Sequence, residues 1–377
     1  MSNFPVFLAY FPLYVKDKIG ESVNGKKTKR AVVFHQGALG DFLVAAAAVD
    51  ELAEIGGWTR VDFWSKPEHV SLLAEKSYLG ECRPYDSPLI SALLHDSLWR
   101  SAVMPDFLIE ADRIFIFGQT GSRLMAERLS ELLSTEVNWI QSFPQANDAP
   151  EHVSDFIRRQ FAGLFPPISG KPLALSPPAS EKRAAEGLLR ELAIGSKPIL
   201  VHPGSGGRRK VWPLANWHGL IDRVRRELSR EVALSIGPAD EYMDKFAAAM
   251  RETGIPVVSG LTPLRLSALL SLCGLYIGSD SGVSHLAAAV GIPTIAVFGP
   301  TDPFVWAPRG RGAIAVRRKW KEQDVLRWAP SERPDFQDEE IIALIQASYK
   351  ASIKNPDGDH PSGQGSGLGR VKSAGSR

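Results

Sequence analysis

The sequence of 377 residues contains little cysteine, has almost no net charge, and contains no hydrophobic run long enough for a membrane span. Its two cysteines, Cys82 and Cys273, lie far apart and form neither a metal-binding nor a redox spacing. The 44 Lys and Arg residues nearly balance 42 Asp and Glu residues, and a net charge of +2 argues against a nucleic-acid partner. Low cysteine content fits a reducing, cytoplasmic location.

Two widespread nucleotide-binding signatures are also missing. Neither a GxGxxG fingerprint nor a Walker A motif occurs, which argues against an ordinary NAD-dependent or P-loop enzyme. The 44% hydrophobic and 23% charged residues are typical of a globular protein. The chain is long enough for about two to three domains.

Strand-like and helix-like segments alternate in two parts of the chain, 30–165 and 181–354. This alternation predicts two domains, each with a parallel β-sheet covered by helices. Between them, five prolines fall within the sixteen residues 165–180, so neither a helix nor a strand can run through. We therefore predict a linker at 166–180.

The two ends of the chain differ from these domains in composition. Residues 1–29 begin with an apolar, aromatic stretch that Pro5 and Pro12 interrupt, and they lack the basic leader and cleavage site of a signal peptide. A packed extension and a membrane-surface contact both remain open for this segment, with packing favoured. Residues 355–377 are rich in Gly, Ser and charge, which predicts a disordered tail.

Two loops that follow strand-like runs carry polar residues. In the first, QGALGD at 36–41, Asp41 stands at a helix start, either as a chemically active acid or only as an N-cap. In the second, PGSGGRRK at 203–210, the small residues Ser205 and Gly206 would let backbone amides approach a phosphate, and Lys210 would add a positive charge.

A third loop lies between a strand predicted at 275–278 and a helix predicted at 282–290. Asp280, Ser281 and Gly282 stand at this junction, where free N–H groups and a partial positive charge suit a phosphate. An ordinary strand-to-helix turn explains them equally well. His285, about one turn into the helix, is either a ligand contact or a buried core histidine.

Two segments carry a family resemblance. HPGSGGRRKVWPLANW and GSDSGVSHLAAAVGIPTIAVFGPTDP resemble glycosyltransferase family 9, the lipopolysaccharide heptosyltransferases, which transfer heptose from ADP-heptose. GALGDFL and SIGPADE match the family as well, and the resemblance covers residues 30–350. It implies an α/β fold of GT-B architecture, in which two Rossmann-like domains face a central cleft. The acceptor would bind the first domain, 30–165, and the nucleotide sugar the second, 181–354.

The resemblance also implies roles for individual residues. Asp41 matches the family's catalytic base, and Lys210 with the helix that follows Ser281 would stabilise the leaving ADP. No metal and no cofactor are expected besides ADP-heptose as the donor substrate. The residues implied in donor binding are Ser205, Gly206, Lys210, Glu241, Asp280, Ser281, Gly282 and His285.

The function implied is inverting transfer of heptose from ADP-heptose to a hydroxyl of a lipopolysaccharide core-type saccharide. One alternative is a GT-B enzyme with another nucleotide sugar or another cell-surface glycan acceptor. A more distant one is a non-catalytic module that binds a nucleotide sugar. The expected partners are the donor and a lipid-linked saccharide acceptor, and a cytoplasmic enzyme with peripheral contact at the inner membrane is compatible with them.

Overall fold

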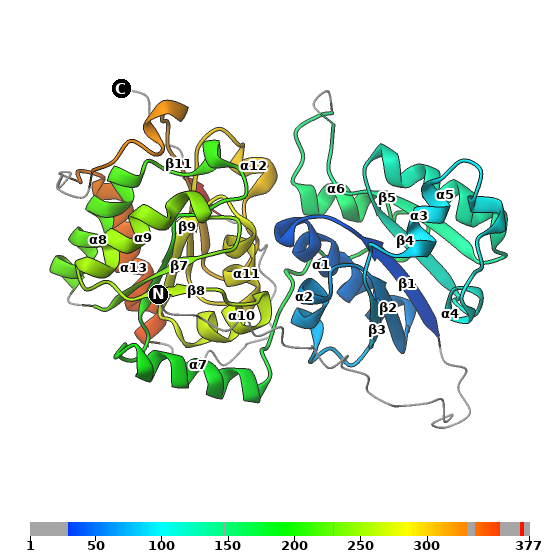
Figure 1. Cartoon of the computed structure of the whole chain (residues 1–377), viewed down its shortest axis with the longest axis horizontal. Coiled ribbons are helices and arrows are strands. Elements are labelled where there is room, and N and C mark those ends of the chain that lie inside the picture. Colours follow the sequence, from blue (N-terminus) through cyan, green and yellow to red (C-terminus); the bar gives the residue numbers. More distant parts are fainter. Residues whose placement is uncertain (1–28, 146–147, 229, 330–335, 355–369, 373–377) are drawn as a thin grey trace, which may run out of the picture.

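The computed structural model describes residues 29–145, 148–228, 230–329, 336–354 and 370–372, which form two parallel α/β domains (Figure 1). Apart from Lys29, the N-terminal extension predicted at 1–29 lies outside these residues. No helix in the described ranges is both long enough and apolar enough to cross a membrane.

The first domain is built on a five-stranded sheet in the order β3-β2-β1-β4-β5, with every pair parallel. The central strand β1 has four consecutive apolar residues at 31–34, each at most 1% exposed, because helices cover both faces of the sheet. The strands are β1 (Arg30–His35), β2 (Arg60–Trp64), β3 (Leu79–Arg83), β4 (Arg113–Gly118) and β5 (Glu136–Gln141). The α-helices are α1 (Leu39–Gly56), α2 (Pro67–Val70), α3 (Pro88–Leu94), α4 (Asp106–Ile109), α5 (Thr120–Leu132) and α6 (Val153–Arg159).

The second domain has a seven-stranded parallel sheet in the order β12-β11-β10-β9-β6-β7-β8. Its strands are β6 (Ile199–His202), β7 (Val232–Ile236), β8 (Val257–Ser259), β9 (Leu275–Ser279), β10 (Thr294–Phe298), β11 (Ala313–Arg317) and β12 (Arg370–Lys372). Its α-helices are α7 (Ala179–Glu191), α8 (Leu214–Leu228), α9 (Asp244–Glu252), α10 (Pro263–Leu272), α11 (Gly282–Val290), α12 (Pro303–Trp306) and α13 (Glu339–Lys354). Short 3₁₀ turns η3 (Arg208–Lys210) and η4 (Glu241–Met243) lie in its loops.

The predicted alternation of strands and helices is confirmed, and so are the positions of most elements. The sequence at 89–100 predicts one helical stretch, but the structure has α3 followed by a 3₁₀ turn, because Asp96 and Ser97 favour turns over helix. The disorder predicted for 355–377 does not hold at 370–372, which form β12 and pair with β11. The other residues of that tail lie outside the described part of the chain.

The chain crosses from the first sheet to the second through residues 160–178, which contain no regular helix or strand. The later part of this crossing is packed, since Leu173 and Leu175 are each 6% exposed. The Leu175 N–H donates to the Ala289 carbonyl at the end of α11 (2.9 Å). The proline-rich segment therefore packs against the second domain before α7 begins.

Helices α1 and α11 bring the two domains together. They lie on the facing sides of the domains in Figure 1, and one apolar cluster continues from α1 side chains such as Leu43 to Leu286 and Ala287 of α11. Burial of this apolar surface stabilises the contact. It also sets the N-terminus of one helix against the N-terminus of the other, which is where the candidate site lies.

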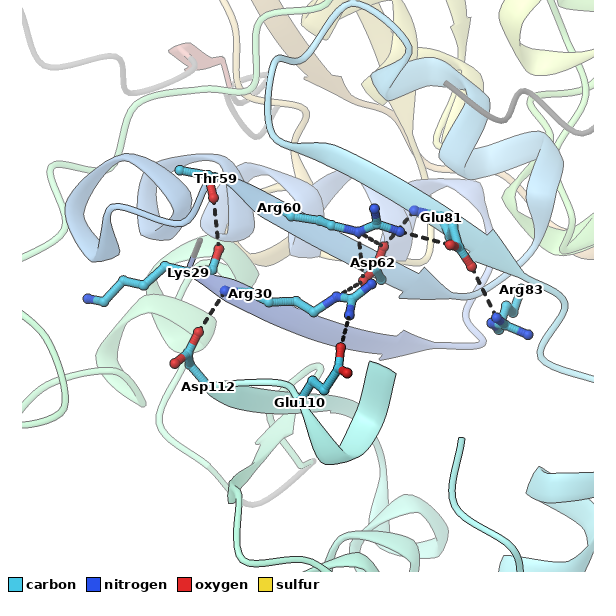
Figure 2. Close-up of polar contacts among 9 residues, drawn as sticks. All are labelled: Lys29, Arg30, Thr59, Arg60, Asp62, Glu81, Arg83, Glu110 and Asp112. Carbon is cyan, nitrogen blue, oxygen red and sulfur yellow. Dashed lines mark hydrogen bonds and ion pairs between the residues drawn. The ribbon is translucent and has the colours of Figure 1, made fainter. Parts of the chain in front are cut away.

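An ion network occupies the opposite, amino-terminal edge of the first sheet (Figure 2). Arg30 and Arg60 are register partners at the starts of β1 and β2, so their like charges lie side by side. Asp62, 2% exposed, accepts from Arg30 Nε (2.7 Å), from Arg60 Nε (2.9 Å) and from the Glu81 N–H (2.6 Å). This buried carboxylate therefore pairs with both arginines and joins three neighbouring strands.

Candidate functional site

Asp41 lies in the first turn of α1, directly after β1. The helix begins at Leu39 with Ala38 as the N-cap residue, so Asp41 is the third helical residue and not the N-cap considered from the sequence. Its Oδ2 accepts the Ala38 backbone N–H (3.2 Å), which is one half of a capping box. The turn needs glycine at 37, because a Cβ there would lie 2.8 Å from both the Asp41 Cβ and the His35 Cε1.

The surroundings of Asp41 make it a better proton acceptor than an exposed aspartate. Burial raises the pKa of its carboxyl, while the Ala38 hydrogen bond and the positive charges of Lys210 and Lys66 lower it less strongly. Lys210 belongs to the second domain, so this electrostatic contact crosses between the domains. Lys66, exposed before α2, is a nearby charge that sequence reasoning missed.

Lys210 and Asp280 form the charged centre of the second-domain side. Lys210 ends η3 and its Nζ lies 3.0 Å from Asp280 Oδ2. The Asp280 carboxylate is almost buried, and the Thr301 hydroxyl donates to the same Oδ2 (2.5 Å). Thr301 was not among the predicted site residues, although it lies within the GPTDP turn. Lys210 keeps 31% of its side chain exposed, so the ammonium remains accessible to an anion.

Ser205 and Gly206 lie in the loop after β6 but differ in what they offer a ligand. The Ser205 hydroxyl donates to the Asp280 carbonyl (2.7 Å), and Tyr242 Oη bridges the Ser205 backbone N–H (3.2 Å) and carbonyl (3.0 Å). Ser205 therefore joins two loops. At Gly206 an added Cβ would meet nothing within 4 Å, so its backbone borders open space. Contact of either residue with a phosphate stays a prediction.

Helix α11 begins at Gly282 with an N-terminus that no side chain caps. Serine is a preferred N-cap residue, yet the side chain of Ser281 at the N-cap position makes no capping hydrogen bond. The first N–H groups of the helix are thus left without a side-chain acceptor, and a helix N-terminus of this kind favours an anion.

The N-terminus of α11 touches the N-terminus of α1 through two glycines. A Cβ at Gly282 would lie 2.8 Å from the Gly40 nitrogen and 2.9 Å from the Leu39 Cβ, which are both in the first domain. A Cβ at Gly40 would meet nothing closer than 3.5 Å. The two positions therefore differ sharply in their tolerance of a methyl group, although they are neighbours.

We expect Gly282→Ala to lower any activity that needs the two helix N-termini in contact by about five- to 150-fold, because overpacking of this kind costs about 1–3 kcal/mol. Gly40→Ala is the matched control and should change activity far less. Steady-state kinetics of both variants, with urea unfolding to check stability, makes the comparison. Equal losses in the two variants would contradict the close packing at Gly282.

His285 lies beside this junction, on the first turn of α11. Its ring is half-buried and hydrogen-bonds to the Trp306 carbonyl, and burial lowers its pKa although Asp280 opposes the shift. The ring Cδ2 would be 3.5 Å from a Cβ at Gly40. His285 is therefore a neutral ring at the domain contact, with one ring nitrogen already hydrogen-bonded. Its partial exposure fits a ligand contact, and its internal hydrogen bond fits a core histidine.

Glu241, the predicted ribose-binding acid, is exposed at the start of η4. Its neighbour Asp240 is the buried acid of the pair, at 2% exposure, and accepts from the Gly237 N–H (2.8 Å). Asp240 Oδ2 also lies 3.6 Å from His202 Nε2. The SIGPADE segment thus contains two acids with different surroundings. Asp240 is buried and structural, and it was not among the predicted site residues. Glu241 is exposed, and its contact with a ribose stays a prediction.

These residues bring an acid with a raised pKa, an accessible ammonium and an uncapped helix N-terminus to one junction between two domains. The acid can remove a proton from a hydroxyl. The ammonium and the helix N–H groups can stabilise a negative charge that develops opposite it. The arrangement suits transfer of a group from a phosphate leaving group to a hydroxyl.

Comparison with known proteins identifies the family of this chain. The family model described as glycosyltransferase family 9 (heptosyltransferase) matches residues 144–332, half of the chain. The chain belongs to glycosyltransferase family 9. The matched range includes the loop with Lys210 and the segment with Asp280, whereas Asp41 lies before it.

A curated relative of this family-9 chain is the lipopolysaccharide heptosyltransferase 3 of Escherichia coli. The two are 32% identical over 145 residues, which is 37% of this chain and 41% of the relative. The lipopolysaccharide heptosyltransferase 1 of Pseudomonas aeruginosa is 28% identical over 185 residues, or 45% of this chain and 49% of that protein. The chain thus aligns with less than half the length of these curated relatives.

A solved structure extends the likeness to the whole fold. The family-9 glycosyltransferase of Veillonella parvula superposes with a TM-score of 0.67 at 17% identity, covering 86% of this chain and 98% of that one. The fold of the family-9 chain is therefore the α/β GT-B architecture, with two parallel-sheet domains facing one another.

Proposed function

We propose that this protein transfers heptose from ADP-heptose to a hydroxyl of a lipopolysaccharide core-type saccharide, with inversion at the anomeric carbon. The observation that carries the proposal is that Asp41 of the first domain and Lys210 of the second meet at two helix N-termini. The names of the curated relatives supply the sugar and the acceptor class. We further propose that ADP-heptose is the donor substrate and that no metal takes part.

In the proposed reaction, Asp41 takes the proton of the acceptor hydroxyl as that oxygen bonds to the anomeric carbon. The bond between this carbon and the phosphate oxygen breaks, and ADP leaves with an added negative charge. Lys210 and the free N–H groups at Gly282 stabilise that charge. Base assistance of this type contributes about 10²–10⁴-fold to a rate.

Several of the proposed donor-binding residues contact one another, and these contacts orient Lys210. Asp280 holds Lys210 in place, and Thr301 holds Asp280, so the ammonium is oriented before the donor arrives. Ser205 fixes its loop to the Asp280 carbonyl. Gly206, Ser281 and His285 border the same junction, and the exposed Glu241 is free to bind the ribose.

The proposed partners follow from the domains on which the candidate residues lie. The nucleotide sugar would bind the second domain, and the lipid-linked saccharide would bind the first, beside Asp41. An acceptor with a lipid anchor would place the protein at the cytoplasmic face of the inner membrane as a peripheral enzyme.

A panel of nucleoside diphosphates tests the donor half. ADP should raise the melting temperature most, with UDP and GDP far behind, and a ligand at 100 times its dissociation constant adds about 2.7 kcal/mol of stability. Melting of the full chain with ADP, UDP, GDP and CDP decides this. A largest shift with UDP would contradict ADP-heptose as donor and would leave the family and fold unaffected.

Lys210→Ala should weaken ADP binding by about 1.5–3 kcal/mol, the cost of a lost charged hydrogen bond, which corresponds to about ten- to 150-fold in dissociation constant. Arg209→Ala removes the same charge from the neighbouring exposed position and serves as the control. Isothermal titration calorimetry measures both. Unchanged affinity in Lys210→Ala would remove this residue from the donor site.

A further inference from the structure

Residues 301–309 connect the donor side of the junction to the first domain. At one end, the Thr301 hydroxyl donates to the Asp280 carboxylate (2.5 Å), and the Trp306 carbonyl accepts from the His285 ring. At the other end, Ala307 and Arg309 contact residues of the first domain. One short segment, which includes α12, therefore touches both the candidate donor site and the opposite domain.

The contact with the first domain is made to α6 and its N-cap residue. Arg309 donates to the Asp155 carboxylate through both terminal nitrogens, with Nη1 2.6 Å from Oδ1 and Nη2 2.5 Å from Oδ2. This guanidinium holds the pKa of the Asp155 carboxyl below its usual range. A two-point pair of this kind fixes orientation as well as distance. In Figure 1, α12 lies on the side of the second domain that faces α6.

A neutral histidine adds a buried contact next to this pair. His152 Nε2 donates to the Ala307 carbonyl (2.9 Å), while its Nδ1 accepts the Ser154 N–H (3.2 Å). Burial, with the charge of Arg309 as a smaller cause, lowers the pKa of His152 to about 4, so the ring keeps this donor–acceptor arrangement at neutral pH. The Trp306 and Phe143 rings meet edge to face, 5.7 Å apart.

Helix α6 is in turn fixed to α1, the helix that carries Asp41. Arg158 of α6 pairs with Glu51 of α1 at 3.0 Å, and both side chains are at most 8% exposed. The other Glu51 oxygen accepts from the Ser169 hydroxyl (2.8 Å). A continuous set of contacts thus runs from Asp280 through 301–309 and α6 to the helix of Asp41.

We propose that Arg309 and Asp155 are positioning residues for the transfer, which hold the closed arrangement in which Asp41 faces Lys210. The inference rests on the proposed function for its kinetic part. Neither side chain reaches the reacting atoms. Loss of the pair lowers the population of the closed arrangement, so turnover falls, while the candidate donor-binding residues, which all belong to the second domain, keep their affinity for ADP.

The test uses Arg309→Gln and Asp155→Asn, which break the pair from opposite domains, and the charge-reversed double variant Asp155→Arg/Arg309→Asp. Each single variant should lower kcat about tenfold, leave the dissociation constant of ADP within about twofold, and raise the radius of gyration measured by X-ray scattering. The double variant should restore kcat and the radius of gyration toward the wild-type values.

Asp338→Asn is the matched control. Asp338 accepts from Arg318 Nε (2.6 Å) and Nη2 (2.9 Å), a two-point pair confined to the second domain. Its loss should change neither the radius of gyration nor turnover.

Unchanged scattering and turnover in both single variants would overturn the inference, as would a loss of ADP affinity equal to the loss of turnover. The scattering measurement needs no substrate, so it decides the question even if the wild-type protein fails to use ADP-heptose. That failure would contradict the proposed function alone.

Discussion

Replacement of Asp41 by asparagine is expected to abolish most of the transfer and to leave the fold intact. An asparagine at this position keeps the size of the side chain, and its carbonyl oxygen can still accept the Ala38 N–H that Asp41 accepts. It cannot accept a proton near neutral pH, so kcat should fall by about 10²–10⁴-fold. Initial rates of ADP release measure the effect.

Donor binding and stability provide the controls for this variant. Because Lys210, Asp280 and the other candidate donor residues lie on the second domain, the ADP dissociation constant should hold. Urea unfolding should give nearly the wild-type midpoint. Full activity in Asp41→Asn would show that Asp41 has only a structural role, through its hydrogen bond with Ala38. The base would then have to lie elsewhere on the first domain.

The raised pKa of Asp41 predicts how the rate of transfer depends on pH. In the proposed reaction the active form is the ionised carboxylate, and burial shifts its protonation to higher pH. The wild-type rate should therefore fall as the pH drops, beginning above the range in which an ordinary aspartate titrates. Asp41→Asn should lack this acidic limb.

Asp62→Ala should give the largest loss of stability, about 3 kcal/mol or more, because it leaves Arg30 and Arg60 without their shared buried carboxylate. The Glu81 N–H also loses its acceptor. Equilibrium urea denaturation measures the change in the free energy of unfolding. Transfer per folded molecule should remain, since the network lies at the edge of the sheet opposite Asp41.

Glu110→Ala is the control from the same network (Figure 2). Glu110 pairs with Arg30 at 3.2 Å, but its side chain is 66% exposed. An exposed pair contributes at most about 1 kcal/mol. Equal losses in Asp62→Ala and Glu110→Ala would show that burial of Asp62 is not what makes its contacts important.

Regular apolar patterning made most of the fold predictable from the sequence. Helix α8, helix α10 and strand β7 have the bounds that their hydrophobic runs and flanking turn residues indicate. The sequence does not indicate strands β3, β5 and β11. The burial pattern of β3 and β5 explains two of these cases, because both are edge strands with mostly half-exposed or exposed residues. Strands like these carry too weak an apolar signal to stand out.

The candidate site was predictable where residues follow one another along the chain. Asp280, Ser281 and Gly282 lie at the strand-to-helix junction that the sequence indicates. Contacts between distant segments were not predictable. The approach of Gly282 to Gly40, the hydrogen bond from Thr301 to Asp280 and the burial of Asp240 in place of Glu241 depend on how the loops pack. Sequence spacing carries no information on such packing.

The most direct test of the central claim is acceptor-dependent release of ADP from ADP-heptose. The purified chain of 377 residues is incubated with ADP-heptose, with and without heptose-deficient lipopolysaccharide, and ADP and modified acceptor are both quantified. We expect ADP release only with acceptor, one heptose gained per ADP, and loss of both in Asp41→Asn. Transfer from a UDP-sugar in place of ADP-heptose, or no transfer by the wild-type protein, would contradict it.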